Sequence, residues 1–215
     1  MFEILFENAD FIAVNKPEGI AAIPEQNPQE PSLFERLCAE RDETLLIVHR
    51  IDKDTSGVIL FARNAEAHRH LNMEFETRRT RKVYLALTHG VIAGDWGKID
   101  KPLAHFGSGR VGVNAQHGKS SLTEYKIVQR LPSHTLIEAY PKTGRRHQIR
   151  VHLYSIGHAI VGDRLYGDRA IQRDYPRMML HARRLTIRPP SGDELTIEAP
   201  APQSFTDVVD SLAGA

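Results

Sequence analysis

HRIDKDTSG, at positions 49–57, connects two short apolar runs. These runs are LLIV at 45–48 and VILFA at 58–62, both of strand length and rich in branched or aromatic residues, which predicts two strands. The connection holds two carboxylates, two cations, two hydroxyls and a glycine. Ionised groups beside core strands are costly unless they are paired or exposed in a cleft, so the pattern indicates chemistry. The alternative is a solvated turn, because Asp, Lys, Thr, Ser and Gly are also turn residues.

Length and composition are those of an ordinary globular protein. The 215 residues suffice for one substantial core, and we predict a single catalytic domain over residues 1–215. No apolar run approaches the length of a bilayer span, which argues against membrane insertion. The first seven residues lack the basic segment and the small-residue cleavage site of a signal peptide, so we expect a cytoplasmic protein.

The cysteine and histidine content argues against a metal site. Cys38 is the sole cysteine, which excludes an internal disulfide and a multi-cysteine zinc site. There are eleven histidines, but the pairs His68 with His70 and His147 with His152 do not have the i, i+4 spacing with a glutamate that a helical zinc site requires. We predict that the protein binds no metal.

The net charge of +1 conceals a strong asymmetry along the chain. Residues 1–45 carry ten acids against three bases, whereas residues 141–190 carry eleven Lys or Arg against three Asp. A basic half suits a phosphate-backbone partner, because each neutralised phosphate also releases counterions. Solvated surface is the alternative for any one of these charges. The excess of eight positive charges in fifty residues favours nucleic acid.

Outside the central stretch, the pattern predicts a mixture of strands and helices. Ser32 and Glu35 form a capping box, and Asn64 is a favourable N-cap. Residues 94–119 are rich in glycine and polar side chains and give only short extended pieces, such as 97–103. The predicted strands are 2–6, 11–15, 82–87, 122–130, 135–139 and 196–199, and the predicted helices are 33–41, 64–77, 145–156 and 203–212.

Two further segments carry candidate functional residues. KVYLAL at 82–87 alternates, which puts Tyr84 on the face opposite Val83 and Leu85; packing with an exposed hydroxyl is the alternative for this tyrosine. KTGRRHQIRVHL at 142–153 predicts an amphipathic basic helix, with Arg146 and Arg150 four residues apart on one face. Contact with phosphates is the simplest use of such a helix.

Taken in order, these segments resemble the motifs of the RluA-type pseudouridine synthases, which isomerise uridine in structured RNA. Arg146 departs from the family pattern, since a small polar residue is common there. The resemblance covers residues 15–182 in the motifs VNKPEG at 14–19, HRIDKDTSG at 49–57, KVYLAL at 82–87, TGRRHQIRVH at 143–152 and MLHA at 179–182, and it continues through GHAIVGDRLYG at 157–167.

The resemblance implies roles for individual residues. Asp52 matches the catalytic aspartate, and Arg50 matches the arginine that helps to displace the target base from its stack. Tyr84 matches the tyrosine that stacks against the base in the active site, and Arg150 matches the arginine that pairs with the aspartate. Physically, a nearby arginine would keep a buried Asp52 ionised and fix its direction. The residues expected to contact the RNA are Arg50, Thr55, Arg145, Arg146, His147 and Leu180; plain core packing is compatible with the role of Leu180.

The resemblance also implies a fold, a partner and a reaction. The fold is α/β of the α+β type, a pseudouridine-synthase-like domain with a curved, mainly antiparallel mixed sheet flanked by helices. The partner is structured RNA, a ribosomal or transfer RNA stem-loop, and we expect a monomer. The reaction is redox-neutral and transfers nothing to a second substrate, so no cofactor is expected. Whether Asp52 attacks the ribose anomeric carbon or carbon 6 of uracil stays open.

Two rival functions remain at this point. An RNA-binding module without catalysis would need only the basic half of the chain. Asp52 argues against it, because a carboxylate in a phosphate-binding groove repels its ligand unless it has a catalytic task. A glycosidase could use Asp52 and Asp54 as paired carboxylates. The aromatic content of 7% is low for binding sugars, and the positive charge suits phosphates better.

Overall fold

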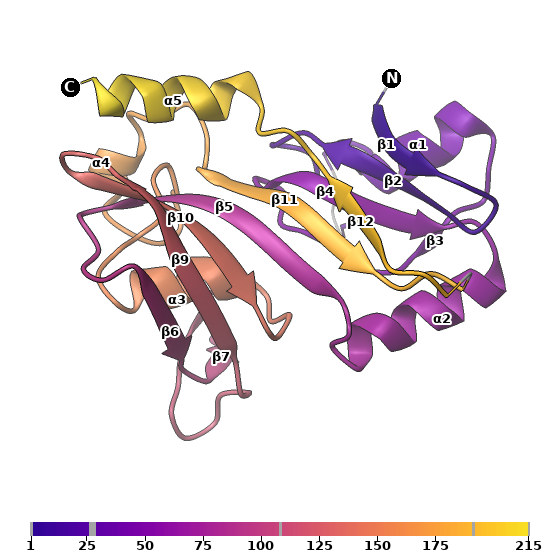
Figure 1. Ribbon diagram of the computed structural model, residues 1–215, viewed down its shortest axis with the longest axis horizontal. Coiled ribbons are helices and arrows are strands. Elements are labelled where there is room, and N and C mark those ends of the chain that lie inside the picture. Colours follow the sequence, from indigo (N-terminus) through magenta and orange to yellow (C-terminus); the bar gives the residue numbers. More distant parts are fainter. Residues whose placement is uncertain (1, 26–28, 108, 191, 215) are drawn as a thin grey trace. The chain divides into compact units, whose positions relative to one another are not determined.

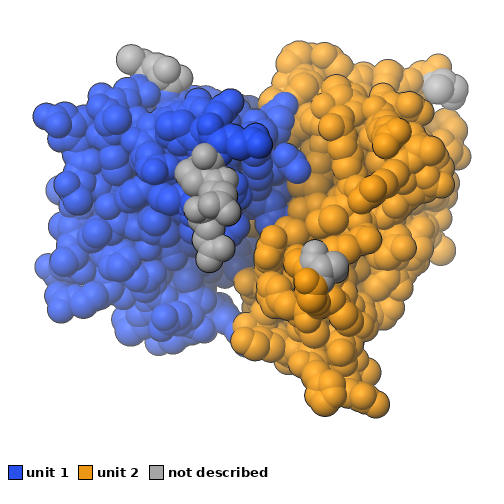
Figure 2. Space-filling view, turned by 180° about the vertical axis from the view of Figure 1, so that it is seen from behind, with its two compact units in different colours: residues 1–82, 182–200 blue, residues 83–181, 201–215 orange. Residues whose placement is uncertain are grey.

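A computed structural model describes residues 2–25, 29–107, 109–190 and 192–214 (Figure 1). The chain forms two compact units, each with its own hydrophobic core. Unit 1 comprises residues 1–82 and 182–200, and unit 2 comprises residues 83–181 and 201–215 (Figure 2). No helix among the described residues is long and apolar enough to cross a membrane. That residues 1–215 act as a single catalytic domain stays a prediction.

Unit 1 is built on a sheet in which β4 follows β2 and is followed by β11. The pairs β1–β2, β2–β4, β3–β4 and β11–β12 are antiparallel. Asn8 closes the β1–β2 hairpin, because its Oδ1 accepts hydrogen bonds from the backbone N–H groups of Asp10 and Phe11. The strands are β1 (Glu3–Glu7), β2 (Phe11–Lys16), β3 (Leu46–Ile47), β4 (Ser56–Ala62), β11 (Leu180–Ile187, in this unit from Ala182) and β12 (Leu195–Glu198).

Both faces of β2 and β4 are covered, which explains their unbroken apolar sequences. Successive side chains point to opposite faces of a strand. Leu60 of β4 accordingly belongs to the core cluster of α2 (Ala65–Glu76), whereas Phe61 belongs to that of α1 (Leu33–Arg41). The N-caps predicted for both helices are confirmed: Ser32 and Glu35 form a complete capping box, and the Asn64 side chain accepts from Ala67 N.

Unit 2 contains an antiparallel sheet in the order β5–β10–β9–β6 and a separate two-stranded hairpin, β7–β8. The strands are β5 (Arg81–His89, in this unit from Val83), β6 (Trp96–Asp100), β7 (Leu103–His105), β8 (Val111–Val113), β9 (Leu122–Arg130) and β10 (His134–Pro141); the helices are α3 (Gln148–Tyr154), α4 (Arg169–Gln172) and α5 (Gln203–Ala213).

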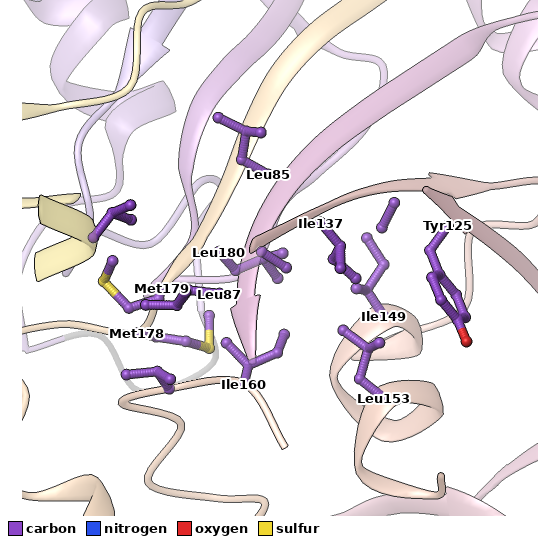
Figure 3. Packing of buried hydrophobic residues seen from close by; sticks show 14 of the residues in the cluster. Leu85, Leu87, Tyr125, Ile137, Ile149, Leu153, Ile160, Met178, Met179 and Leu180 are labelled. Carbon is purple, nitrogen blue, oxygen red and sulfur yellow. The ribbon is translucent and has the colours of Figure 1, made fainter. Parts of the chain in front are cut away.

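The core of unit 2 joins the sheet to its helices. Ile149 and Leu153 of α3 belong to the same buried cluster as Tyr125 of β9 and Ile137 of β10, and Figure 3 shows these four side chains near one another. Phe205 of α5 belongs to this cluster as well. The other labelled members are Leu85, Leu87, Ile160, Met178, Met179 and Leu180.

The predicted fold class is confirmed, since helices pack on antiparallel sheets in each unit. Most predicted elements agree with the structure to within two residues, and β7, β8, α4 and β11 were not predicted. The helix predicted over 145–156 is wrong at its start: His147 has a left-handed backbone, φ 54°, so α3 begins only at Gln148. The helix is not an amphipathic basic surface either, because residues 148–153 are all buried. Arg146 lies in the exposed turn before it and shares no helix face with Arg150.

Candidate active site

Asp52 occupies a tight turn in unit 1, and the buried side chain of Lys16 is hydrogen-bonded to the backbone of this turn. The backbone N–H of Thr55 donates to Asp52 O at 3.1 Å, which closes the turn. Lys16 has no exposed surface, and its Nζ donates to three carbonyl oxygens, those of Pro17 and Ile20 at 2.8 Å and of Lys53 at 2.7 Å. These bonds use all three ammonium donors, which is how a buried charge becomes tolerable. The Asp52 turn is thereby tied to the segment that follows β2.

His49 anchors the start of the same loop. Its ring stacks on Phe75 of α2 with 4.5 Å between ring centroids, and its Nε2 accepts a hydrogen bond from Leu60 N at 3.1 Å. Burial, with a smaller contribution from the positive charge of Lys82, lowers the pKa of His49 to about 3. The imidazole is therefore neutral at physiological pH and acts as an acceptor for the backbone of β4, not as an acid.

The loop presents its side chains at different depths. Arg50 and Asp54 are exposed, Asp52 is half-buried, and Thr55 is only 1% exposed. The buried hydroxyl Oγ1 of Thr55 has no hydrogen-bond partner among the described residues. An unsatisfied buried hydroxyl is costly, which makes the Thr55 hydroxyl a candidate for binding a ligand.

Gly57 is needed where the loop enters β4. Its φ is +111°, and a Cβ at this position would lie 2.2 Å from the carbonyl oxygen of Ala182. Both the backbone conformation and the close approach to β11 therefore require glycine. The glycine of the Thr-Ser-Gly motif thus has a structural reason that is independent of catalysis.

In unit 2, Thr143 and Gln148 shape the turn that precedes α3. Thr143 Oγ1 donates to Gln148 Oε1 at 2.6 Å and accepts from Leu122 N at 3.1 Å. Gln148 Oε1 also accepts from Arg145 N, while Gln148 Nε2 donates to Leu122 O. This network fixes the turn to β9 and explains why the chain does not enter a helix at Arg145. It leaves Arg146 exposed and Arg145 and His147 half-buried.

Arg150 forms a buried ion pair that was not predicted from the sequence. Its Nε donates to Asp163 Oδ2 at 2.7 Å and its Nη2 to Asp163 Oδ1 at 2.8 Å. Arg150 is 6% exposed and Asp163 is 1% exposed. Paired, planar contacts of this kind fix the guanidinium in direction as well as in position.

Tyr166 packs against the same arginine. The Arg150 Cζ lies 5.1 Å from the centroid of its ring, and Arg110 lies over the ring at 5.5 Å. The Tyr166 hydroxyl accepts from Val111 N at 3.1 Å and shares a hydrogen bond of 2.9 Å with His147 Nδ1. Burial raises the pKa of Tyr166 above its ordinary value, so the hydroxyl keeps its proton.

The other two predicted residues of unit 2 lie on strands. Tyr84 is half-buried on β5, opposite Ala139 of β10, and packs against the core of the unit. Leu180 is 3% exposed and is a member of that core (Figure 3). Core packing of Leu180 is confirmed, while its predicted contact with RNA stays a prediction.

Apart from Tyr84 and Leu180, the predicted residues fall into two sets. One loop of unit 1 carries Arg50, Asp52 and Thr55, and one turn and helix of unit 2 carry 145–150. The pairing of Asp52 with Arg150 stays a prediction. No role was predicted for Lys16 or for Asp163. Both lie in segments that carry the family resemblance, and this position was the only signal in the sequence that could have pointed to them.

Comparisons of the sequence and the structure with known proteins all give matches to one family. The sequence profile described as RNA pseudouridylate synthase matches residues 10–155. The dual-specificity RNA pseudouridine synthase RluA of Vibrio vulnificus is 37% identical over 198 residues, covering 88% of this chain and 79% of the relative. The ribosomal large subunit pseudouridine synthase D of Pseudomonas aeruginosa is 34% identical over 227 residues, with 94% and 69% covered.

A solved structure extends the likeness to three dimensions. Human RNA pseudouridylate synthase domain containing 1 superposes with a TM-score of 0.81 at 27% identity, covering 100% of this chain and 96% of that chain. The profile match over residues 10–155 includes the Asp52 turn and α3. The chain therefore belongs to the RNA pseudouridine synthase family, and within it to the RluA type.

Proposed function

We propose that this protein isomerises specific uridines to pseudouridine in structured ribosomal or transfer RNA, with Asp52 as its nucleophile and without a cofactor. Family membership and the relatives named as RNA pseudouridine synthases, one of them of the ribosomal large subunit, support the reaction. The observation that carries the assignment of Asp52 is its turn: Asp52 is half-buried, its backbone carbonyl accepts from Thr55 N, and the carbonyl of the next residue, Lys53, accepts a hydrogen bond from the buried ammonium of Lys16. We also propose that residues 1–215 act as one catalytic domain, in the cytoplasm and as a monomer.

The reaction breaks the bond between N1 of uracil and C1′ of ribose, and it forms a bond between C5 and C1′. The proton on C5 is lost and N1 gains one, so no electrons are exchanged with a second reactant. The target base must leave its stack first, which costs a few kcal/mol. Arg50, which is exposed at the start of the loop, offsets this cost by helping to displace the base from its stack.

Asp52 then attacks, either at C1′ or at C6 of uracil, and so holds one fragment while the other turns. Tyr84 stacks against the detached uracil, and Arg150 pairs with the Asp52 carboxylate. Thr55, Arg145, Arg146, His147 and Leu180 complete the contacts with the RNA. The exposed Arg146 suits contact with phosphate, whereas the buried Thr55 hydroxyl suits a single specific hydrogen bond.

The test compares Asp52→Asn with Asp54→Asn, which changes the exposed carboxylate of the same turn. We expect Asp52→Asn to abolish pseudouridine formation in a prefolded stem-loop, while its affinity for that RNA stays within about tenfold of wild type. Asp54→Asn should remain active. Equal loss in both variants would favour paired carboxylates, and wild-type turnover by Asp52→Asn would remove Asp52 from the mechanism.

A further inference from the structure

Asp163 is more firmly held than its ion pair with Arg150 requires. Besides the two bonds from the guanidinium, its Oδ1 accepts from Leu165 N at 3.0 Å and from Tyr166 N at 3.1 Å. The preceding residue is fixed as well, because Gly162 N donates to the side-chain oxygen of Gln172. The carboxylate is therefore oriented by its own loop, whether or not the arginine is present.

The guanidinium of Arg150 is held on a second side by the ring of Tyr166. That ring cannot turn freely, since its hydroxyl is hydrogen-bonded to Val111 N of β8 and to Nδ1 of His147, the residue before α3. Asp163 thus determines the direction of the guanidinium, and Tyr166 determines its plane. The guanidinium of Arg110 also lies over the Tyr166 ring, with its Cζ 5.5 Å from the ring centroid.

We propose that Asp163 is a positioning residue for the isomerisation: it orients Arg150 and balances its charge. The inference rests on the proposed function, in which Arg150 pairs with the nucleophile Asp52. A carboxylate that faces an uncompensated arginine is strongly stabilised as an anion, which weakens it as a nucleophile. With Asp163 bound along one edge, Arg150 offers Asp52 oriented hydrogen bonds, while much of its charge is already balanced.

A buried ion pair that serves only stability is the competing explanation, and it predicts different kinetics. We would measure single-turnover rates over a range of RNA concentrations and of pH, together with RNA affinity, for Asp163→Asn and Asp163→Glu. Glu74→Gln is the matched control, because Glu74 is also buried and pairs with an arginine, Arg79, at 3.3 Å. Thermal unfolding of each variant reports on stability alone.

For Asp163→Asn we expect a rate at saturating RNA at least tenfold below wild type, because misplacement of a catalytic group by about 1 Å can cost 100-fold. Affinity for RNA should stay within threefold. The acid limb of the rate–pH profile should move to lower pH, since the uncompensated Arg150 now favours the anionic nucleophile. Asp163→Glu keeps the charge, so it should lower the rate without moving this limb. Glu74→Gln should leave the rate and the limb unchanged.

A double variant tests whether Asp163 acts through Arg150. Added to Arg150→Lys, Asp163→Asn should lower the rate no further, whereas independent effects would multiply. Wild-type rates for both Asp163 variants, or multiplying effects, would overturn the inference. If Asp163→Asn does not fold, Asp163→Glu decides by the same rate criterion. A wild-type protein that forms no pseudouridine in ribosomal or transfer RNA would instead refute the proposed function.

Discussion

Replacing Lys16 by methionine tests whether the buried ammonium holds the Asp52 turn. Methionine keeps most of the aliphatic length but donates no hydrogen bond, so three carbonyl oxygens lose a partner. Pro17 is exposed and its carbonyl can turn to water, and Lys53 O keeps the bond from Gly19 N at 3.0 Å. The half-buried Ile20 is therefore the most affected residue.

The size of the effect follows from these differences. A buried acceptor left without a partner costs about 1–3 kcal/mol, and a partial loss costs less. Full loss at Ile20 and partial loss at Lys53 give a decrease in the free energy of unfolding of about 3 kcal/mol. Lys53→Met is the control, since that side chain is exposed in the same turn and should change stability by less than about 0.5 kcal/mol.

Urea unfolding followed by circular dichroism would measure both variants, and single-turnover kinetics would report on the Asp52 turn. Lys16→Met should also turn over more slowly at saturating RNA, because the turn that carries the nucleophile has lost its tether. If the stabilities of Lys16→Met and Lys53→Met agree to within about 1 kcal/mol, the ammonium does not hold the loop, and the reasoning fails.

Three more predictions concern other parts of the structure. The pKa of His49 is lowered to about 3 in the folded protein, so its contribution to stability is fully present above an unfolded pKa of about 6.5 and falls as pH drops toward 3. Urea unfolding between pH 7 and pH 4 should show this decline, at up to about 1.4 kcal/mol per pH unit, and His49→Gln should reduce it; an unchanged slope would contradict the assignment. Gly57→Ala should destabilise unit 1 by more than about 2 kcal/mol. Gly19→Ala should cost only about 1 kcal/mol, because Gly19 also has a positive φ but a Cβ there would meet open space. Equal losses of stability in thermal unfolding would mean that the contact with Ala182 does not explain the glycine. Arg146→Ala should lower the slope of log affinity for RNA against log salt concentration by about one, because an exposed cation strengthens RNA binding by contacting a phosphate. The rate at saturating RNA should not change. An unchanged slope would mean that Arg146 contacts no phosphate.

The elements that the sequence predicted well are those determined by neighbouring residues. The capping residues Ser32 and Asn64 fix the starts of α1 and α2, because each side chain bonds to an N–H three residues later. The continuous apolar run at 58–62 predicted the strand β4, and side chains of this strand belong to two different core clusters. In these places, local propensity and the pattern of burial agree.

The features that the sequence did not predict depend on distant contacts. His147 has a left-handed backbone, and the side chain of the next residue, Gln148, is hydrogen-bonded to Leu122 of β9. The helical spacing of the local sequence does not contain this contact, so the predicted start of α3 was wrong. Lys16 and Lys53 are 37 residues apart, and no spacing rule connects them. Asp52 and Arg150 were identified by resemblance to a family, which names the reacting groups. It does not name the residues, such as Asp163, that hold them in place.

The route of the chain between the two units has a consequence for synthesis on the ribosome. Unit 1 is completed by residues 182–200. After β4 has been synthesised, it therefore lacks its neighbouring strand β11 until residues 63–179 have been made. During this interval the edge of β4 near Gly57 has backbone groups without their final partners, and such edges can pair with other chains. We therefore expect nascent chains truncated before residue 182 to bind chaperones, and chains extended past residue 200 to be released.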